Sequence, residues 1–285
     1  MQRLMISHLT EYAYASPVTL GPHQLMLRPR EGHDVRIESS KLEISPVAAL
    51  KWHRDAFDNS VAVATFSAPT DKLTVASEVT IEHYEDAPLD FVIEDYAVNY
   101  PFVYGPDERV ELVPYQQLAY PTGQDGLRDW VASLGLAQGP IETYALLAQM
   151  NGAIAGSFTY ARREEPGVQT PTQTLADRRG SCRDYAALFI EACRYLGLAS
   201  RFVSGYVHAP STEAGNAATH AWAEVYLPGP GWKGFDPTSG EITGANHIAV
   251  AVARRPESVP PVSGTFTGPT GPPATMMVDV RVQRL

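Results

Sequence analysis

Three side chains of the types used in nucleophilic catalysis occur in the order Cys182, His220, Asp236. A thiolate can attack a carbonyl carbon, and an imidazolium can pair with the thiolate and later protonate a leaving amine. A carboxylate can fix the tautomer of the imidazole. A single histidine on a strand is often structural, and Asp-Pro is often a turn, so each residue alone indicates little. Together the three predict an acyl-transfer triad.

Cys182 lies where a helix is expected to begin. Ser181 is a good N-cap residue, and Asp184 three residues later completes a pattern that resembles a capping box. The free N–H groups and the dipole of a helix N-terminus stabilise an anion, and the thiolate is the reactive form of cysteine. The charge of Asp184 opposes this effect, whereas Gly180 allows a tight turn and the close approach of a substrate. We therefore expect Cys182 to be the nucleophile.

The second cysteine, Cys193, is predicted to be a packing residue in the middle of the same helix. The helical rise places the two cysteines about 16 Å apart along the axis, whereas a disulfide needs Cα atoms within ~7 Å. The same separation prevents both from binding one zinc ion with His220 and Asp236. We predict no disulfide and no metal, and without a glycine-rich phosphate loop we predict no cofactor.

His220 and Asp236 are expected on the two strands of a β-hairpin. The strand-like segments are residues 219–227 and 232–238, and a Pro-Gly-Pro-Gly sequence separates them. The two side chains can share a face of this hairpin only if the loop has an odd number of residues. A loop of two or four residues would place them on opposite faces unless a bulge intervened.

One register satisfies this condition. Pairing Tyr226 with Trp232 puts Asp236 opposite Trp222, and therefore diagonal to His220. Diagonal neighbours on one face lie ~7–8 Å apart, which a histidine–carboxylate hydrogen bond can span. The register is thus a geometric prediction that a structure can test.

The remaining elements divide the chain into four segments. Residues 1–95 alternate polar and apolar side chains, which predicts an N-terminal antiparallel β-sandwich or folded sheet. Residues 96–123 contain four prolines and are predicted to form an irregular connection. Residues 124–255 have helical and strand patterns and are predicted to form an α+β catalytic core. In residues 256–285 we expect a Pro/Gly-rich surface loop to 273, followed by a last strand that returns to a sheet.

Composition limits the classes of partner. The 285 residues suggest about two domains. A formal net charge of −10 argues against nucleic acid and against an anionic membrane surface as partners. We find no apolar run of transmembrane length and no secretory signal. We expect a cytoplasmic protein that acts on a peptide or protein.

Several blocks of the sequence resemble the bacterial transglutaminase-like superfamily. In the core they are Gly180-Ser-Cys-Arg-Asp-Tyr-Ala, Leu196-Gly-Leu-Ala-Ser-Arg-Phe-Val-Ser-Gly-Tyr206, His220-Ala-Trp-Ala-Glu-Val-Tyr and Phe235-Asp-Pro-Thr. His8-Leu-Thr-Glu-Tyr-Ala-Tyr-Ala-Ser-Pro-Val, Leu25-Met-Leu-Arg-Pro-Arg30 and Asp55-Ala-Phe-Asp-Asn resemble the N-terminal β domain of such proteins. The resemblance implies a papain-like α+β core in which Cys182 is the nucleophile, His220 the base and acid, and Asp236 the residue that orients the histidine. The sequence departs from the family at Arg183, where glutamine often follows the cysteine.

The superfamily contains cross-linking enzymes, peptidases, amidases and members that have lost the cysteine. Because this chain retains all three residues, we expect a cysteine peptidase or amidase that hydrolyses peptide or isopeptide-like amides through a thioester. The alternatives are a protein cross-linking transglutaminase, in which an amine accepts the acyl group, and a noncatalytic binding module on the same fold.

Further site residues follow from the chemistry of the oxyanion, which needs hydrogen-bond donors. The backbone N–H of Cys182 is one candidate, and the side chains of Tyr160 and Gln173 are candidates for a second donor. Trp222 shares a face with His220, where it could form a wall of the site or pack in the core. Glu224 lies farther along the strand and is expected to pair with Arg201.

Overall fold

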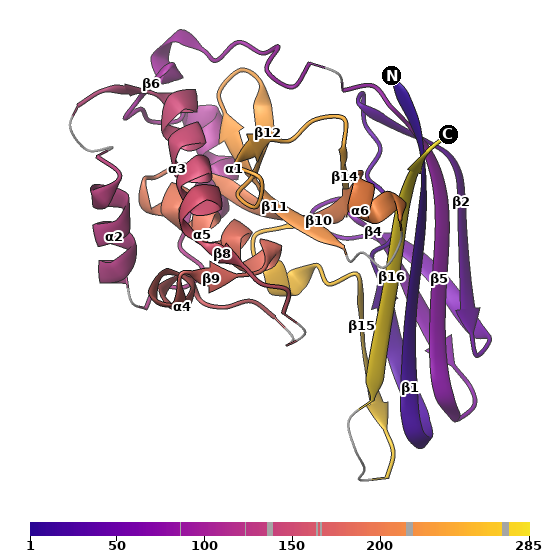
Figure 1. Ribbon diagram of the computed structural model, residues 1–285. Helices are drawn as coiled ribbons and strands as arrows, with labels where there is room; N and C mark the ends of the chain where they lie inside the picture. The colour runs from indigo at the N-terminus through magenta and orange to yellow at the C-terminus, as the bar shows by residue number, and fades with distance from the viewer. Residues whose placement is uncertain are drawn as a thin grey trace.

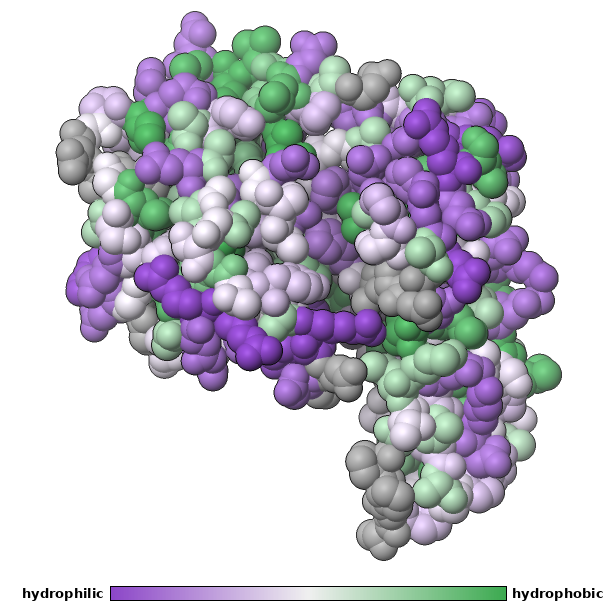
Figure 2. Space-filling model, in the orientation of Figure 1, coloured by the Kyte–Doolittle hydropathy of each residue, from purple (hydrophilic) through white to green (hydrophobic). Residues whose placement is uncertain are grey.

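The computed structural model describes residues 1–85, 87–122, 124–135, 139–163, 165, 167–214, 219–269 and 274–285. An elongated sheet lies beside a mixed core of helices and strands, and the two chain ends meet at one end of this sheet (Figure 1). In the space-filling view the far end of the sheet protrudes beyond the core (Figure 2). Within the described ranges, no helix is long and apolar enough to cross a membrane.

The elongated sheet is built around one long strand. Among the described residues it has seven strands, ordered β2-β5-β1-β4-β3, with β15 and β16 also paired to β1. Their bounds are β1 (Gln2–Leu25), β2 (Val35–Ser45), β3 (Ala48–Arg54), β4 (Ser60–Phe66), β5 (Thr70–His83), β15 (Val262–Thr267) and β16 (Thr275–Arg284). The predicted alternation is confirmed at the start of β1, where Leu4, Ile6, His8 and Thr10 are buried.

The two layers of the predicted sandwich are parts of one curled sheet. The first half of β1 pairs with β5 and β16, whereas its second half pairs with β4 and β15. The pairing of β1 with β5 is interrupted between Ala13 and Val18, where β1 passes from one layer to the other. A small apolar core, which includes Val18, Leu25, Ala62 and Leu73, fills the space that the curl encloses.

Two segments are more regular than the sequence predicts. Residues 106–116 form a helix inside the predicted irregular connection, because Pro106 occupies its first turn, where no N–H is needed. Only Leu112 of this helix is buried, so the segment lacks an apolar face that sequence periodicity could reveal. Within the predicted surface loop, residues 262–267 form β15, since these six positions contain no proline. Residues 270–273 of that loop lie outside the described residues.

The core combines a second sheet with helices. In the part of the chain that is described, this sheet has five antiparallel strands ordered β13-β12-β11-β10-β14. Its strands are β10 (Ser200–Val207), β11 (His220–Leu227), β12 (Gly231–Asp236), β13 (Glu241–Ile242) and β14 (His247–Ala253). The helices are α1 (Pro106–Gln116), α2 (Gln124–Ser133), α3 (Thr143–Ser157), α4 (Pro171–Asp177), α5 (Cys182–Tyr195) and α6 (Pro210–Glu213). Short elements are η1 (Asp95–Ala97), η2 (Pro256–Ser258), β6 (Asn99–Tyr100), β7 (Ile141–Glu142), β8 (Thr159–Tyr160) and β9 (Arg179–Gly180).

Helix α5 is buried on nearly every side, including the face that carries Glu191 and Arg194. Glu191 and Arg194 on that face form an ion pair of 2.9 Å whose side chains are both 1% exposed. The Glu191 carboxylate also accepts the backbone N–H groups of Ala119 and Tyr120, and Arg194 donates to backbone carbonyls. Polar partners surrounding both charges make their burial tolerable.

The curled sheet docks on the core through buried polar contacts. The side chain of Asn59 donates to the carbonyl of Val252 and accepts its N–H, both at 2.8 Å. Nδ1 of His8 lies 2.9 Å from the hydroxyl of Tyr206 on β10. These contacts place the N-terminal sheet against β10 and β14 of the core, close to the histidine-bearing strands.

Candidate active site

Cys182 begins α5, as the sequence predicts, and its side chain is buried. The reciprocal half of the capping box is present, because the backbone N–H of Ser181 donates to Oδ2 of Asp184 at 2.8 Å. Asp184 also accepts 2.7 Å hydrogen bonds from Arg163 and from the N–H of Gln169. The charge that we expect to oppose a thiolate is therefore balanced by a guanidinium, which the sequence pattern does not reveal.

The hairpin has the predicted register. Tyr226 pairs with Trp232, and the next pair, Leu227 and Gly231, leaves an odd loop of residues 228–230. His220 and Asp236 consequently lie on one face, and Nε2 of His220 is 2.7 Å from Oδ2 of Asp236.

His220 contacts Cys182 as well as Asp236. Burial lowers the pKa of His220, but the hydrogen bonds to Asp236 and to Cys182 outweigh it and raise the pKa to about 10. Because Nε2 is engaged by Asp236, Nδ1 is the nitrogen left for the sulfur. The structure thus brings Cys182, His220 and Asp236 together in the order sulfur, imidazole, carboxylate.

The Asp236 carboxylate is held on both oxygens. Oδ1 accepts the N–H of Thr238 at 2.9 Å, and Oδ2 accepts from His220. Burial would raise the pKa of Asp236, but the hydrogen bonds from His220 and His247 hold it well below its ordinary range. Asp236 is therefore an anion at neutral pH, as a residue that supports an imidazolium must be.

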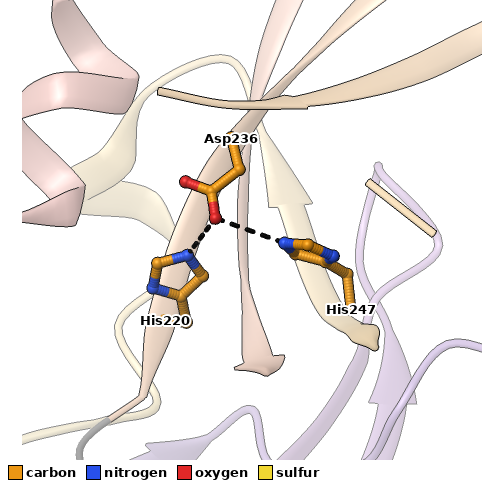
Figure 3. A group of neighbouring side chains, drawn as sticks. All are labelled: His220, Asp236 and His247. Atoms are coloured by element: carbon orange, nitrogen blue, oxygen red, sulfur yellow. Dashed lines mark hydrogen bonds and ion pairs between the residues drawn. The ribbon is translucent and has the colours of Figure 1, made fainter. Parts of the chain in front are cut away.

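A second histidine, which the sequence analysis misses, shares this carboxylate. Nε2 of His247 is 3.2 Å from Oδ2 of Asp236, so both rings point at the same oxygen from different strands (Figure 3). The His247 ring also packs edge-on against Trp222, with 5.3 Å between ring centroids. His247 stands alone at the start of an apolar strand, and no motif or spacing in the sequence connects it with His220.

The same three residues could be considered as metal ligands. Their nearest ligand atoms, from His220, Asp236 and His247, lie within 4.8 Å of one another. A metal ion needs donors that converge on a point ~2.0–2.2 Å from each. Here the two imidazoles converge on the carboxylate oxygen itself (Figure 3), so the arrangement is that of a hydrogen-bond network.

Of the two side chains predicted to donate to the oxyanion, Tyr160 contacts Cys182 and Gln173 bonds to Asp177. The Tyr160 hydroxyl contacts Cys182, and burial together with the charge and hydrogen bond of Cys182 raises the Tyr160 pKa to about 12, so the phenol stays a donor. Gln173 has a hydrogen-bond partner outside the proposed triad. Its exposed side chain donates to Asp177, one turn farther along α4, at 3.1 Å, because it lies on the outward face of this short helix.

Trp222 combines the two roles considered for it. It is 2% exposed, as a core residue would be, and its ring borders both histidines. The expected pair of Arg201 and Glu224 is confirmed at 2.6 Å.

Two models of known sequence families match parts of this chain. A sequence model described as the bacterial transglutaminase-like N-terminal region matches residues 4–82. A model of the transglutaminase-like superfamily matches residues 133–237, a range that contains Cys182, His220 and Asp236. The chain therefore contains a bacterial transglutaminase-like N-terminal region followed by a transglutaminase-like core region. The transglutaminase-like core consists of helices and antiparallel strands, and it follows strands β1 to β5 of the curled N-terminal sheet in the sequence.

Similar proteins align with most of this chain. An uncharacterized protein of Mycobacterium tuberculosis is 28% identical over 276 residues, covering 92% of this chain and 87% of its own length. An uncharacterized protein of Mycobacterium leprae is 25% identical, covering 94% of each chain. The crystal structure of a proposed cysteine protease from Cytophaga hutchinsonii superposes with a TM-score of 0.74 at 16% identity, covering 100% of this chain and 91% of the other. This last similarity shows the fold of the transglutaminase-like core and not its activity.

Proposed function

We propose that this protein is a cysteine peptidase or amidase that cleaves peptide or isopeptide-like amides through a thioester. The observation that carries the proposal is one continuous chain of contacts. Cys182, at the start of α5, contacts His220, and the other ring nitrogen of His220 bonds to the buried carboxylate of Asp236. Each contact serves one step of acyl transfer.

In the acylation step, the thiolate of Cys182 attacks the amide carbon, and the carbonyl π electrons move to oxygen. Protonated His220 donates its Nδ1 proton to the nitrogen of the leaving amine as the C–N bond breaks. This leaves a thioester on Cys182, a free amine and a neutral imidazole, while Asp236 keeps the Nε2 proton in place.

In the second step, water replaces the amine. Neutral His220 accepts a proton from water at Nδ1 as the oxygen attacks the thioester carbon. The C–S bond then breaks, releasing a carboxylic acid and restoring the thiolate–imidazolium pair. An amine in place of water would yield a new amide, which is the cross-linking outcome.

The oxyanion formed in both steps needs donors. The backbone N–H of Cys182 lies in the first turn of α5, where the helix supplies no carbonyl acceptor. The phenol of Tyr160 contacts the sulfur and remains protonated at neutral pH, so it provides the second donor.

A mass-spectrometric screen of peptide and amide libraries tests the proposal. The wild type, Cys182→Ala and Cys193→Ala are compared, because Cys193 is a second buried cysteine of the same helix, 11 positions after Cys182. We expect the wild type and Cys193→Ala to cleave the same substrates and Cys182→Ala to cleave none. Each reaction is run with and without an added primary amine.

Product masses separate the outcomes. Addition of water identifies a hydrolase, whereas incorporation of the added amine identifies a cross-linking enzyme. Equal cleavage by the wild type and Cys182→Ala would contradict cysteine catalysis. Substrate capture without turnover by both proteins would instead indicate a binding module.

A further inference from the structure

One carboxylate oxygen in this site serves two histidines. Oδ2 of Asp236 is 2.7 Å from Nε2 of His220 and 3.2 Å from Nε2 of His247 (Figure 3). Two donors on one oxygen divide its negative charge, so each hydrogen bond weakens the other. Thr238 holds the second oxygen through its backbone N–H at 2.9 Å, so the position of Asp236 does not depend on His247 alone.

The orientation of the His247 ring is fixed from several sides. Its Nδ1 faces the backbone N–H of Gly244, which leaves Nε2 as the nitrogen that carries a proton toward Asp236. Trp222 packs edge-on against the ring, and the N–H of His247 donates to the carbonyl of Gly244 at 2.8 Å. The donor to Asp236 is therefore held in place by its own turn and by a buried indole.

The backbone of His247 is held in turn by the N-terminal sheet. His83, at the end of β5, donates from Nε2 to the carbonyl oxygen of His247 at 3.1 Å. Nδ1 of His83 accepts the N–H of Glu85, which assigns the donating proton to Nε2. Gln2 on β1 donates to the carbonyl of Ala245, two residues before His247. Two strands of the curled sheet thus contact the turn that presents this histidine.

We propose that His247 is a positioning residue that competes with His220 for the Asp236 carboxylate and that the N-terminal sheet sets this competition through His83. The inference rests on the proposed function, because it concerns the residue that orients the catalytic histidine. It assigns the N-terminal sheet a role in tuning the site.

The competition between His247 and His220 for Asp236 would help His220 to donate its proton. A carboxylate devoted to His220 alone would hold the imidazolium proton more tightly and deliver it less readily to a leaving amine. By taking part of the charge of Oδ2, His247 keeps His220 a better acid.

The charged and titratable groups around His247 are few among the described residues. Asp236 and His220 face its ring, and His83 contacts its backbone. His208 directly follows β10, whose last residue Val207 pairs with His247, but its side chain is bound to Glu213 at 2.7 Å. Asp236 and His220 are therefore the groups whose titration should respond to His247.

Side-chain NMR of histidine-labelled protein tests the proposal without a substrate. We compare the titration of His220 in the wild type, His247→Leu and His247→Gln, with Cys182 present in all three. The leucine removes the donor, whereas the glutamine amide retains one near the position of Nε2. We expect the titration midpoint of His220 to rise by about half to one pH unit in His247→Leu and to stay near wild type in His247→Gln.

Two results would overturn the proposal. The midpoint of His220 could stay unchanged or fall in His247→Leu, which would mean that His247 does not compete for the oxygen. Alternatively, leucine and glutamine could shift it equally, which would mean that His247 acts by packing. Melting temperatures of all variants verify that each is folded at the pH of the titration.

A double-mutant cycle tests the link to the N-terminal sheet. His83→Leu removes the donor to the His247 carbonyl, and we expect it to shift the midpoint of His220 in the same direction as His247→Leu, by a smaller amount. In the His247→Leu background the same change should have no effect, because His83 acts through His247. Additive shifts would refute the link. None of these readouts depends on turnover, so the proposed function could fail in the library screen independently of them.

Discussion

The buried histidine at the junction of the two sheets should make this protein sensitive to mild acid. His8 on β1 lies within hydrogen-bond distance of the Tyr206 hydroxyl at Nδ1 and of Thr10 at Nε2. Burial lowers the pKa of His8 from 6.5 to about 4. Between these values the unfolded chain binds a proton that the folded chain does not, so stability falls as the pH drops below 6.5.

The size of this loss follows from the shift. A difference from 6.5 to about 4, at 1.36 kcal/mol for each pH unit, limits the contribution of His8 to about 3 kcal/mol. Between pH 7 and pH 5 the same relation gives a loss of about 2 kcal/mol, a large part of the ~5–15 kcal/mol typical of folded domains. His8→Gln removes the titrating group and retains polar atoms that can reach Tyr206.

Urea unfolding at pH 7 and pH 5 gives the change in the free energy of unfolding between the two pH values, and this change is compared between the wild type and His8→Gln. We expect the free energy of unfolding of the wild type to fall by about 2 kcal/mol more than that of His8→Gln. His53→Gln is the matched control, because His53 is an exposed histidine of the same sheet and should leave the acid sensitivity unchanged. Equal losses in the wild type and His8→Gln would refute the argument from burial.

Three further substitutions test other parts of the structure. In Gly205→Ala the new methyl group would collide with the backbone of β14 and the indole ring of Trp222, so we expect the free energy of unfolding in urea to fall by about 1–3 kcal/mol. Gly152→Ala lies within α3 with open space around it, so it should raise the free energy of unfolding by about 0.5–1 kcal/mol. Equal effects of the two substitutions would contradict the close packing described at Gly205. Arg194→Met leaves the buried Glu191 carboxylate without its cationic partner, so the free energy of unfolding should fall by about 3–5 kcal/mol. A fall of less than about 1 kcal/mol would show that water reaches this ion pair in the folded protein. Tyr160→Phe should lower kcat about 100-fold with KM unchanged on a peptide from the library screen, whereas a wild-type kcat would exclude the phenol as an oxyanion donor.

The main features of the site can be predicted because they depend on local chemistry. The capping residues before Cys182 define the start of α5, and the parity of the hairpin loop determines that His220 and Asp236 share a face. Both arguments use short stretches of sequence in which one geometry is strongly favoured. The alternation at the start of β1 is equally direct, because one side of the strand faces the interior.

The features that the sequence does not reveal depend on contacts between distant segments. His247 reaches Asp236 only because β14 joins the sheet beside β10, a topology that no local pattern encodes. Arg163 neutralises Asp184 across 21 positions of sequence. The face of α5 that carries Glu191 and Arg194 is buried because these two residues find partners in α1, in the segment that follows it and at the start of β10.

The central claim is that His220 and Cys182 form a reactive ion pair, and the rate of alkylation of Cys182 by iodoacetamide tests it most directly. Mass spectrometry follows Cys182 at pH 6, with Cys193 as an internal reference, because burial raises the pKa of that thiol. We predict that Cys182 reacts at pH 6 in the wild type, and that His220→Ala slows the reaction at least about tenfold at this pH, since an ordinary thiol ionises near ~8.5. Equal rates in the two proteins, or no labelling of Cys182 in the wild type, would contradict the account.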